Sequence, residues 1–242
     1  MSTAWPNDEL FSETRVAASE PERIDFGWEP TRRLLVYLLL DCSASMAGAP
    51  IQAVNEGVRQ LHNQLVETPT AIEAVWISII TFGTEASMLV PPTPVANFQP
   101  AELRARGLTS LGAALHLLEH SLDNDVRAST STEKGDWRPL VFMLTDGDPT
   151  DEWESVAEQL KARTEKKPGT IVALACGEAV DLATLEQIAD HVLRMEDVTV
   201  DRLRDFFKWV SASVSGASVS AEAAEHLSTK FPPLPEGLSM TL

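Results

Sequence analysis

The sequence predicts an α/β fold with a doubly wound, mainly parallel sheet, one antiparallel edge strand and helices on both faces. The run Leu34–Leu40 is apolar without polar alternation, which is typical of a strand buried on both faces. Further apolar runs alternate with helical patterns along the chain, as in parallel strands joined by right-handed crossovers. The length of 242 residues and the hydrophobic content of 44% suit one globular domain with extensions.

In the first half of the domain, each element has its own local signal. After the first strand, a helical pattern covers about residues 50–66, and Pro50 suits its first turn. Residues 75–82 are rich in β-branched side chains and predict a strand. Residues 86–90 predict an antiparallel edge strand, which we expect to end at residues 91–94 because proline cannot donate to a ladder.

The second half continues the alternation. Residues 111–122 form a helical pattern and residues 140–144 an apolar strand, after which Thr150 is predicted to cap a helix that runs to about residue 163. The remaining predicted elements are a strand over 170–175, a helix over 182–190, a strand over 191–195 and a helix over about 200–214.

The domain organisation and the charge limit the classes of function. We predict an acidic N-terminal extension over residues 1–31, one domain over residues 32–214 and a C-terminal tail over residues 215–242. The net charge of -17 disfavours nucleic acid and membrane surfaces as partners. The sequence has no signal-peptide pattern and no membrane-length apolar run, which favours a cytoplasmic location. The two cysteines, Cys42 and Cys176, fit neither a metal motif nor a disulfide framework.

Oxygen-bearing side chains follow the predicted strands. Asp41, Ser43 and Ser45 come after the first strand, Thr109 precedes a helix, and Asp146 follows the strand over 140–144. In open α/β sheets, ligands bind outside the carboxyl ends of the strands. Hydroxyls with few carboxylates suit a hard cation such as Mg²⁺ and leave it electrophilic, which favours capture of a partner's carboxylate.

Three neighbouring residues receive ordinary structural interpretations. Asp148 is interpreted as a turn residue, and Asp151 as an acidic residue in the first turn of the following helix, where it suits the helix dipole. Trp153 is interpreted as a packing residue in preference to an exposed contact.

The arrangement Asp41-x-Ser43-x-Ser45, then Thr109, then Asp146-Gly147 resembles the metal-ion-dependent adhesion site (MIDAS) of von Willebrand factor A (vWA) domains. The resemblance covers about residues 32–214 and implies a Rossmann-like fold. It implies that Ser43 and Ser45 bind the ion directly and that Thr109 binds it directly or through water. It further implies that Asp41 and Asp146 act mainly through water, or directly in one conformational state. Ala44 and Leu108 depart from the family pattern, because many members have glycine there, but neither removes a ligand.

Several further stretches resemble the bacterial TerY-like branch, named for tellurium resistance. They are Arg33–Asp41, Pro50–Gly57, Leu144–Asp151, Phe207–Ser213 and the segment from Pro232 to Gly237. The resemblance implies non-enzymatic, cation-dependent protein binding in a stress-response, tellurium-resistance or phage-defence system. It implies a Ser/Thr protein kinase and a PP2C-type phosphatase as partners. Mg²⁺ is the expected cation, although Mn²⁺ and Ca²⁺ accept the same hard ligands.

There are three alternatives, two of them enzymes. A phosphohydrolase of the haloacid dehalogenase type would use Asp41 as nucleophile, but Ser43 stands where it needs an acid/base, and Lys134 is the only lysine before Asp146. A serine hydrolase would need a Gly-x-Ser-x-Gly elbow, which the sequence lacks. The third alternative is a scaffold that acts without a metal.

Overall fold

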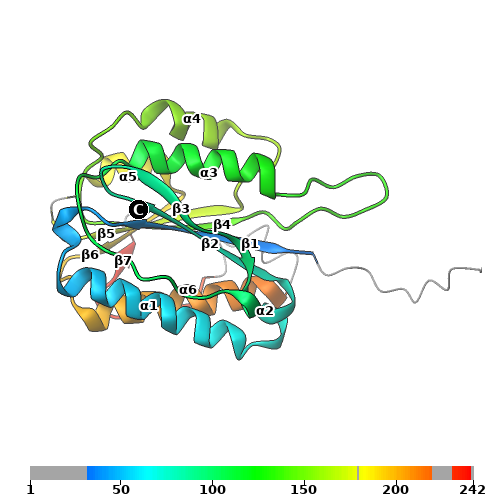
Figure 1. The fold of residues 1–242 in the computed structure, drawn as a ribbon, viewed down its shortest axis with the longest axis horizontal. Coiled ribbons are helices and arrows are strands. Elements are labelled where there is room, and N and C mark those ends of the chain that lie inside the picture. The colour runs from blue at the N-terminus through cyan, green and yellow to red at the C-terminus, as the bar shows by residue number, and fades with distance from the viewer. Residues whose placement is uncertain (1–31, 179, 220–230, 241–242) are drawn as a thin grey trace, which may run out of the picture. The chain divides into compact units, whose positions relative to one another are not determined.

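A single mixed sheet organises residues 32–178, 180–219 and 231–240, which the computed structural model describes (Figure 1). Within these residues seven strands lie in the order β3-β2-β1-β4-β5-β6-β7. The central strands pair in parallel, whereas β3 and β7 are antiparallel to their neighbours. The strands are β1 (Leu34–Asp41), β2 (Val75–Phe82), β3 (Ala86–Pro94), β4 (Leu140–Thr145), β5 (Thr170–Cys176), β6 (His191–Met195) and β7 (Ser239–Met240). The predicted fold class is confirmed, and β7 adds a second antiparallel edge strand that was not predicted.

Helices cover both faces of this sheet. The helices are α1 (Ala49–Val66), α2 (Pro69–Ala74), α3 (Leu111–Asp125), α4 (Glu154–Ala162), α5 (Leu182–Ile188) and α6 (Val200–Val219), with short 3-10 turns η1 (Ala44–Met46) and η2 (Val95–Asn97). Figure 1 shows α1, α2 and α6 on one face and α3, α4 and α5 on the other. The fold is therefore a three-layer α/β/α arrangement.

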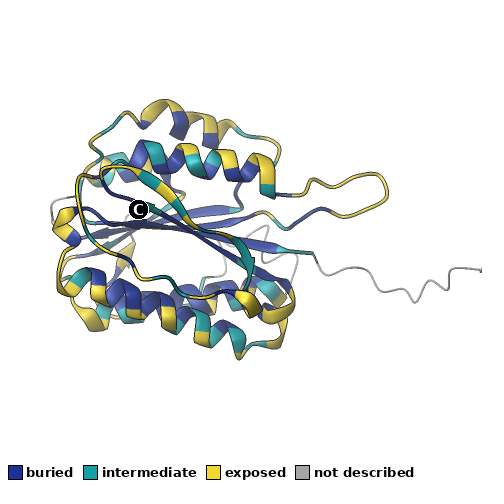
Figure 2. Ribbon diagram, in the orientation of Figure 1, coloured by how far each residue is buried: buried dark blue, intermediate teal, exposed yellow. Residues whose placement is uncertain are grey.

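The central strand β1 explains why its sequence lacks polar alternation. Val36 and Leu38 are two residues apart and belong to the core under α1 and α6, whereas Tyr37 between them belongs to the core under α3 and α4. Every residue of β1 is buried (Figure 2). Because both faces of the strand lie against helices, apolar side chains are required at successive positions.

Two elements extend beyond their predicted ends. Strand β3 continues through residues 91–94 to Pro94, although prolines were expected to end it. An edge strand needs ladder bonds on one side only, and the pairing with β2 shifts register between Ile77 and Ile80, so proline is tolerated. Helix α6 continues to Val219 because residues such as Ala217 still pack in the core. Within the described part of the chain, no helix is both long enough and apolar enough to cross a membrane.

Asn55 fixes the loop that leads to Thr109. It lies on the buried side of α1, where its amide donates to the Leu103 carbonyl at 3.0 Å and its carbonyl accepts from the Leu103 N–H at 2.7 Å. Buried backbone groups that lose their partner cost about 1–3 kcal/mol each. This polar residue was missed in the sequence, where its position among apolar neighbours was the available signal.

We expect Asn55→Ala to lower the free energy of unfolding by about 2 kcal/mol, because Leu103 keeps both polar groups without a partner. Urea unfolding measures the loss, with Gln52→Ala on the exposed side of the same helix as the control. A loss equal to that of the control would contradict the role of Asn55.

Candidate metal centre

The adjacent strands β1 and β4 bring the two predicted carboxylates to one end of the sheet. Leu40 of β1 pairs with Leu144 of β4, so Asp41 lies beside the residues that precede Asp146. The Thr145 hydroxyl donates to Asp41 Oδ2 at 2.6 Å, and the Ser43 N–H donates to Asp41 Oδ1 at 2.7 Å. Asp41 is fully buried, and these two contacts hold its carboxylate in one orientation.

The serine hydroxyls meet the second carboxylate above Asp41. Ser43 begins the turn η1 and Ser45 lies within it, and their hydroxyl oxygens are 2.9 Å apart. Asp146 Oδ1 lies 2.8 Å from Ser45 Oγ and 3.4 Å from Ser43 Oγ. The three oxygens therefore form a small triangle. Adjacent ligands of an octahedral Mg²⁺, each about 2.1 Å from the ion, are about 3.0 Å apart, so the triangle suits this ion.

The loop before α3 places Thr109 beside the Asp146 turn. The Thr109 carbonyl accepts from the Thr150 N–H at 2.9 Å, and the Gly107 carbonyl accepts from the Ala44 N–H at 3.0 Å. A Cβ atom added to Gly147 would lie 3.6 Å from the Thr109 hydroxyl oxygen. The loop is thus tied to both the serine turn and the Asp146 turn, and all five predicted residues lie in one region.

Thr150 and Asp151, which lie in the loop after Asp146, have roles that differ from the predicted ones. Helix α4 begins at Glu154, so Thr150 does not cap it; the Thr150 hydroxyl accepts from the Thr109 N–H at 3.3 Å. Asp151 likewise does not lie in the first turn of α4. Its carboxylate accepts from the N–H groups of Gly112 and Ala113, both at 2.9 Å, at the start of α3. Both residues fasten the Asp146 loop to the Thr109 segment, a tertiary role that local sequence patterns do not indicate.

The predicted metal ligands are mostly neutral hydroxyl groups, with few charged side chains. Within the described residues, no group of three or more His, Cys, Asp or Glu side chains is placed to hold a metal. Ser43, Ser45 and Asp146 instead form an oxygen cluster, with the Asp41 carboxylate below it and Thr109 on the neighbouring loop. These residues fit a hard divalent cation, which prefers oxygen ligands.

Burial raises the pKa values of two ionisable groups next to the cluster, Asp41 and Cys42. It raises the pKa of the Asp41 carboxyl above its ordinary value, although hydrogen bonds from Thr145 and Ser43 act in the opposite direction. Burial also raises the pKa of the Cys42 thiol to about 12, so this thiol stays protonated at neutral pH. Cys42 and Cys176 are both buried and unbridged, as free structural cysteines are.

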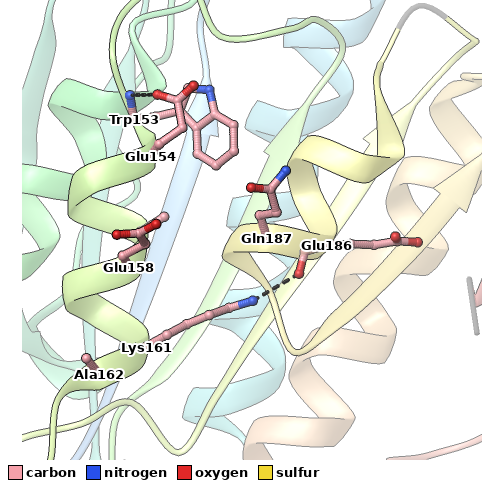
Figure 3. A pocket seen from close by; sticks show the side chains of 8 residues that line it. Trp153, Glu154, Glu158, Lys161, Ala162, Glu186 and Gln187 are labelled. Atoms are coloured by element: carbon pink, nitrogen blue, oxygen red, sulfur yellow. Dashed lines mark hydrogen bonds between the residues drawn. The ribbon is translucent and has the colours of Figure 1, made fainter.

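A groove lies between α4 and α5, and side chains of both helices line it (Figure 3). It has a volume of about 570 Å³, and its lining includes Trp153 and the glutamates Glu154 and Glu158. Trp153 is only 8% exposed, which agrees with its interpretation as a packing residue. Lys161 crosses the groove and donates to the Glu186 carbonyl at 2.9 Å. The groove shares the acidic character of the whole chain.

Fold and site together define an α/β domain with a hydroxyl-rich oxygen cluster at the carboxyl ends of its central strands. The family model of the von Willebrand factor type A domain matches residues 36–208, and the chain belongs to this family. Domains of this family are generally non-enzymatic modules that bind other proteins, often through a metal ion. A comparison with proteins of curated function finds no match.

Solved structures share the fold at low sequence identity. A von Willebrand factor type A protein from Catenulispora acidiphila is 17% identical with a TM-score of 0.57, covering 76% of this chain and 43% of that one. Proximal thread matrix protein 1 from the mussel byssus, with a zinc-occupied MIDAS motif, is 20% identical with a TM-score of 0.53, and the match covers 76% of this chain and 48% of that one. The pilus adhesin SpaC from Lactobacillus rhamnosus GG is 15% identical with a TM-score of 0.60, and the match covers 76% of this chain and 30% of that one. The chain thus spans less than half the length of these proteins.

Proposed function

We propose that this chain binds a divalent cation through Ser43, Ser45 and Thr109, with Asp41 and Asp146, and uses it to capture a carboxylate of a partner protein. The supporting observation is the oxygen triangle of Ser43, Ser45 and Asp146, whose two shorter edges are 2.8 and 2.9 Å. These spacings suit adjacent ligands of Mg²⁺, which is the expected cation.

The charges of the cluster favour binding of an acidic partner group. Ser43, Ser45 and Thr109 contribute neutral oxygens, and Asp41 is occupied by two hydrogen bonds below them. Asp146 is the carboxylate that reaches the hydroxyls. A divalent cation whose direct ligands are neutral oxygens and a single carboxylate would remain electrophilic at its open coordination position. A Glu or Asp side chain of a partner can therefore bind there despite the net charge of -17.

The ion site is tested by comparing the thermal unfolding temperature in Mg²⁺, Mn²⁺ or Ca²⁺ with that in chelator. A ligand at 100 times its Kd stabilises the folded state by about 2.7 kcal/mol, and each kcal/mol raises Tm by about 2–4 °C in a domain of this size. We expect such a rise in the wild type and its loss in Ser45→Ala. Ser45 is exposed, so its replacement leaves the fold intact, whereas Asp41→Ala would also leave Thr145 and Ser43 without their buried partner.

Ser110→Ala is the matched control, because Ser110 adjoins Thr109 but donates its hydroxyl to the Thr84 carbonyl. This variant is expected to keep the cation-dependent rise. Equal shifts in Ser45→Ala and Ser110→Ala would contradict the ion site. No shift in any protein would favour a scaffold that acts without a metal.

The phosphohydrolase alternative needs a lysine at the site. Lys134 precedes Gly135 and Asp136, whose carbonyls accept from the Arg32 side chain at 2.7 and 3.0 Å. Arg32 precedes β1, so Lys134 lies toward the opposite end of the sheet from Asp41. This placement favours the binding function over hydrolysis.

For the biological setting, we propose a bacterial, cytoplasmic role in a TerY-like stress-response, tellurium-resistance or phage-defence system. The support is the resemblance of stretches such as Leu144–Asp151 to that branch. A Ser/Thr protein kinase and a PP2C-type phosphatase are the proposed partners. Binding to a purified candidate of either kind should require the cation and be lost in Ser45→Ala; binding that persists in chelator would contradict a cation-mediated contact.

A further inference from the structure

A second cavity lies at the other end of the sheet from the oxygen cluster. It has a volume of about 300 Å³ and is lined by the loop between α3 and β4 and by residues 164–167 before β5. Its residues Trp137 and Pro139 directly precede β4, whereas Asp146 follows the other end of that strand. Because β4 has six residues at about 3.3 Å each, the two sites are about 20 Å apart.

The charge of this cavity is opposite to that of the chain. Its lining includes four of the 19 basic side chains, Arg127, Arg138, Lys166 and Lys167, but only two of the 36 acidic ones, Asp136 and Glu165. A chain with net charge -17 would not gather cations in one cavity if charge were spread at random. The excess of positive charge therefore indicates an anionic ligand.

One of the two acidic residues of the cavity, Asp136, is already neutralised. Asp136 is fully buried in its side chain and accepts hydrogen bonds from the guanidinium groups of Arg33 and Arg127. Burial acts to raise the pKa of Asp136, but these hydrogen bonds outweigh it and hold the pKa below its ordinary value. Asp136 therefore stays ionised and has no capacity left to neutralise further cations.

Two cationic side chains of the lining remain available. Within the described residues, neither Arg138 nor Lys167 makes an ion pair or a side-chain hydrogen bond, and Lys167 is half-buried. Lys166 has a φ of 50°, in the left-handed region that non-glycine residues seldom adopt, and its ammonium group donates to the Asp123 carbonyl. The Lys166 ammonium group is thus held by Asp123, whereas Lys167 lines the cavity without such a contact to the described residues.

The cavity also offers apolar surface. Val126 and Pro139 are buried in its wall, and Trp137 is half-buried with the Arg32 guanidinium 3.4 Å above its ring. Its volume is at the lower end of the range for small-ligand sites and exceeds that of a single inorganic anion. It therefore has room for an anionic group and for part of the molecule that bears it.

We propose that this cavity binds a phosphomonoester, with Arg138 and Lys167 as the residues that receive the phosphate group. A phosphomonoester has a charge of about -1.5 to -2 at pH 7, which matches two unpaired cations, and arginine favours phosphate through its planar fork of donors. A polyanion such as nucleic acid would be repelled by the rest of the chain. The ligand is thus one phosphate group on a small molecule or on a phosphorylated side chain of a protein.

NMR titration of the full chain with phenyl phosphate tests the site, with the Trp137 indole signal as the readout. The wild type should show saturable shifts, and the double variant Arg138→Ala/Lys167→Ala should bind at least 10-fold more weakly. Arg59→Ala/Lys208→Ala is the matched control, because it removes the same charges from exposed positions on α1 and α6 and should bind as the wild type does. Glu165→Gln removes a carboxylate of the lining and should tighten binding about 2–3-fold.

The probes separate the sources of the phosphate. Tighter binding of a phosphoserine peptide than of phenyl phosphate supports a phosphorylated protein, and the reverse order supports a small molecule. Equal affinity for benzoate and phenyl phosphate would overturn the phosphate assignment. Unchanged binding in Arg138→Ala/Lys167→Ala, or no shift at Trp137 in the wild type, would overturn the site. None of these outcomes depends on the cation at Ser43 and Ser45.

Discussion

Asp136→Ala is expected to lower the free energy of unfolding by about 3–5 kcal/mol, because removal of one partner from a buried ion pair leaves the other charge uncompensated. Asp136 is fully buried in its side chain, and the Arg33 side chain is only 17% exposed. The Asp136 carboxylate also accepts from the Arg127 N–H at 2.8 Å. These contacts attach the loop between α3 and β4 to the residue that precedes β1. The variant therefore loses both a charge pair and a tertiary connection.

Urea unfolding measures this loss, and Asp201→Ala is the matched control. Asp201 also pairs with an arginine, Arg204, but the two side chains are 85% and 39% exposed, and exposed pairs contribute about 0–1 kcal/mol. A loss in Asp136→Ala no larger than that in Asp201→Ala would show that the buried pair is not a main contributor to stability.

The same variant has an expected pH dependence. The pKa of Asp136 is lower in the folded chain than its ordinary value of about 3.9, so its contribution is fully present above that value and decreases as pH falls through the folded pKa. The difference in stability between wild type and Asp136→Ala should therefore narrow below about pH 4. A difference that stays constant from pH 7 to pH 3 would contradict an ionised, paired Asp136.

Gly112→Ala is expected to lower the free energy of unfolding by about 2 kcal/mol and to weaken cation-dependent stabilisation. A Cβ atom at Gly112 would lie 2.0 Å from the Glu152 carbonyl oxygen and 3.2 Å from Asp151 Oδ2. Overpacking of this kind costs about 1–3 kcal/mol. The two nearest obstructing atoms belong to the backbone of Glu152, in the loop that follows Asp146, so relief of the clash must move that loop. Thr109 and Asp146 would then no longer keep their relative positions.

Gly216→Ala provides the control for helix propensity. Gly216 lies in α6 with nothing within 4 Å of an added Cβ atom, so alanine there should stabilise the helix by about 0.5–1 kcal/mol. Thermal unfolding of both variants with and without Mg²⁺ gives the two readouts. Retention of the full Mg²⁺-dependent rise in Gly112→Ala would contradict the coupling between this contact and the ion site.

The arrangement of the sheet could be predicted because its central strands have a strong local signal. The run Leu34–Leu40 shows no alternation of polar and apolar residues, and the structure buries both of its sides. Strand β7 could not be predicted, since its two residues are exposed and gain their conformation only by pairing with β6. Strand β3 continues through its prolines because an edge strand needs backbone N–H donors on one side only, whereas the prediction assumed that proline ends a strand.

The candidate site was predicted as a set of residues, whereas its supports were not. Asp41, Ser43 and Asp146 are polar residues at strand ends, where sequence order alone indicates proximity. Thr145 and Asp151 support them through hydrogen bonds to residues more than 35 positions away, and such contacts depend on the completed fold. The role of each of these residues as a metal ligand stays a prediction.

The prolines of β3 have a consequence for how the domain meets other chains. A strand at the edge of a sheet is a template for an incoming strand, which adds to it through backbone donors and acceptors. The sequence of β3 ends in Pro91-Pro92-Thr93-Pro94, and prolines have no N–H to offer. An incoming strand would therefore lack backbone N–H donors to pair with at several positions along about half of the β3 edge. The same residues that make the strand hard to predict disfavour the addition of a further strand at the β3 edge of the sheet.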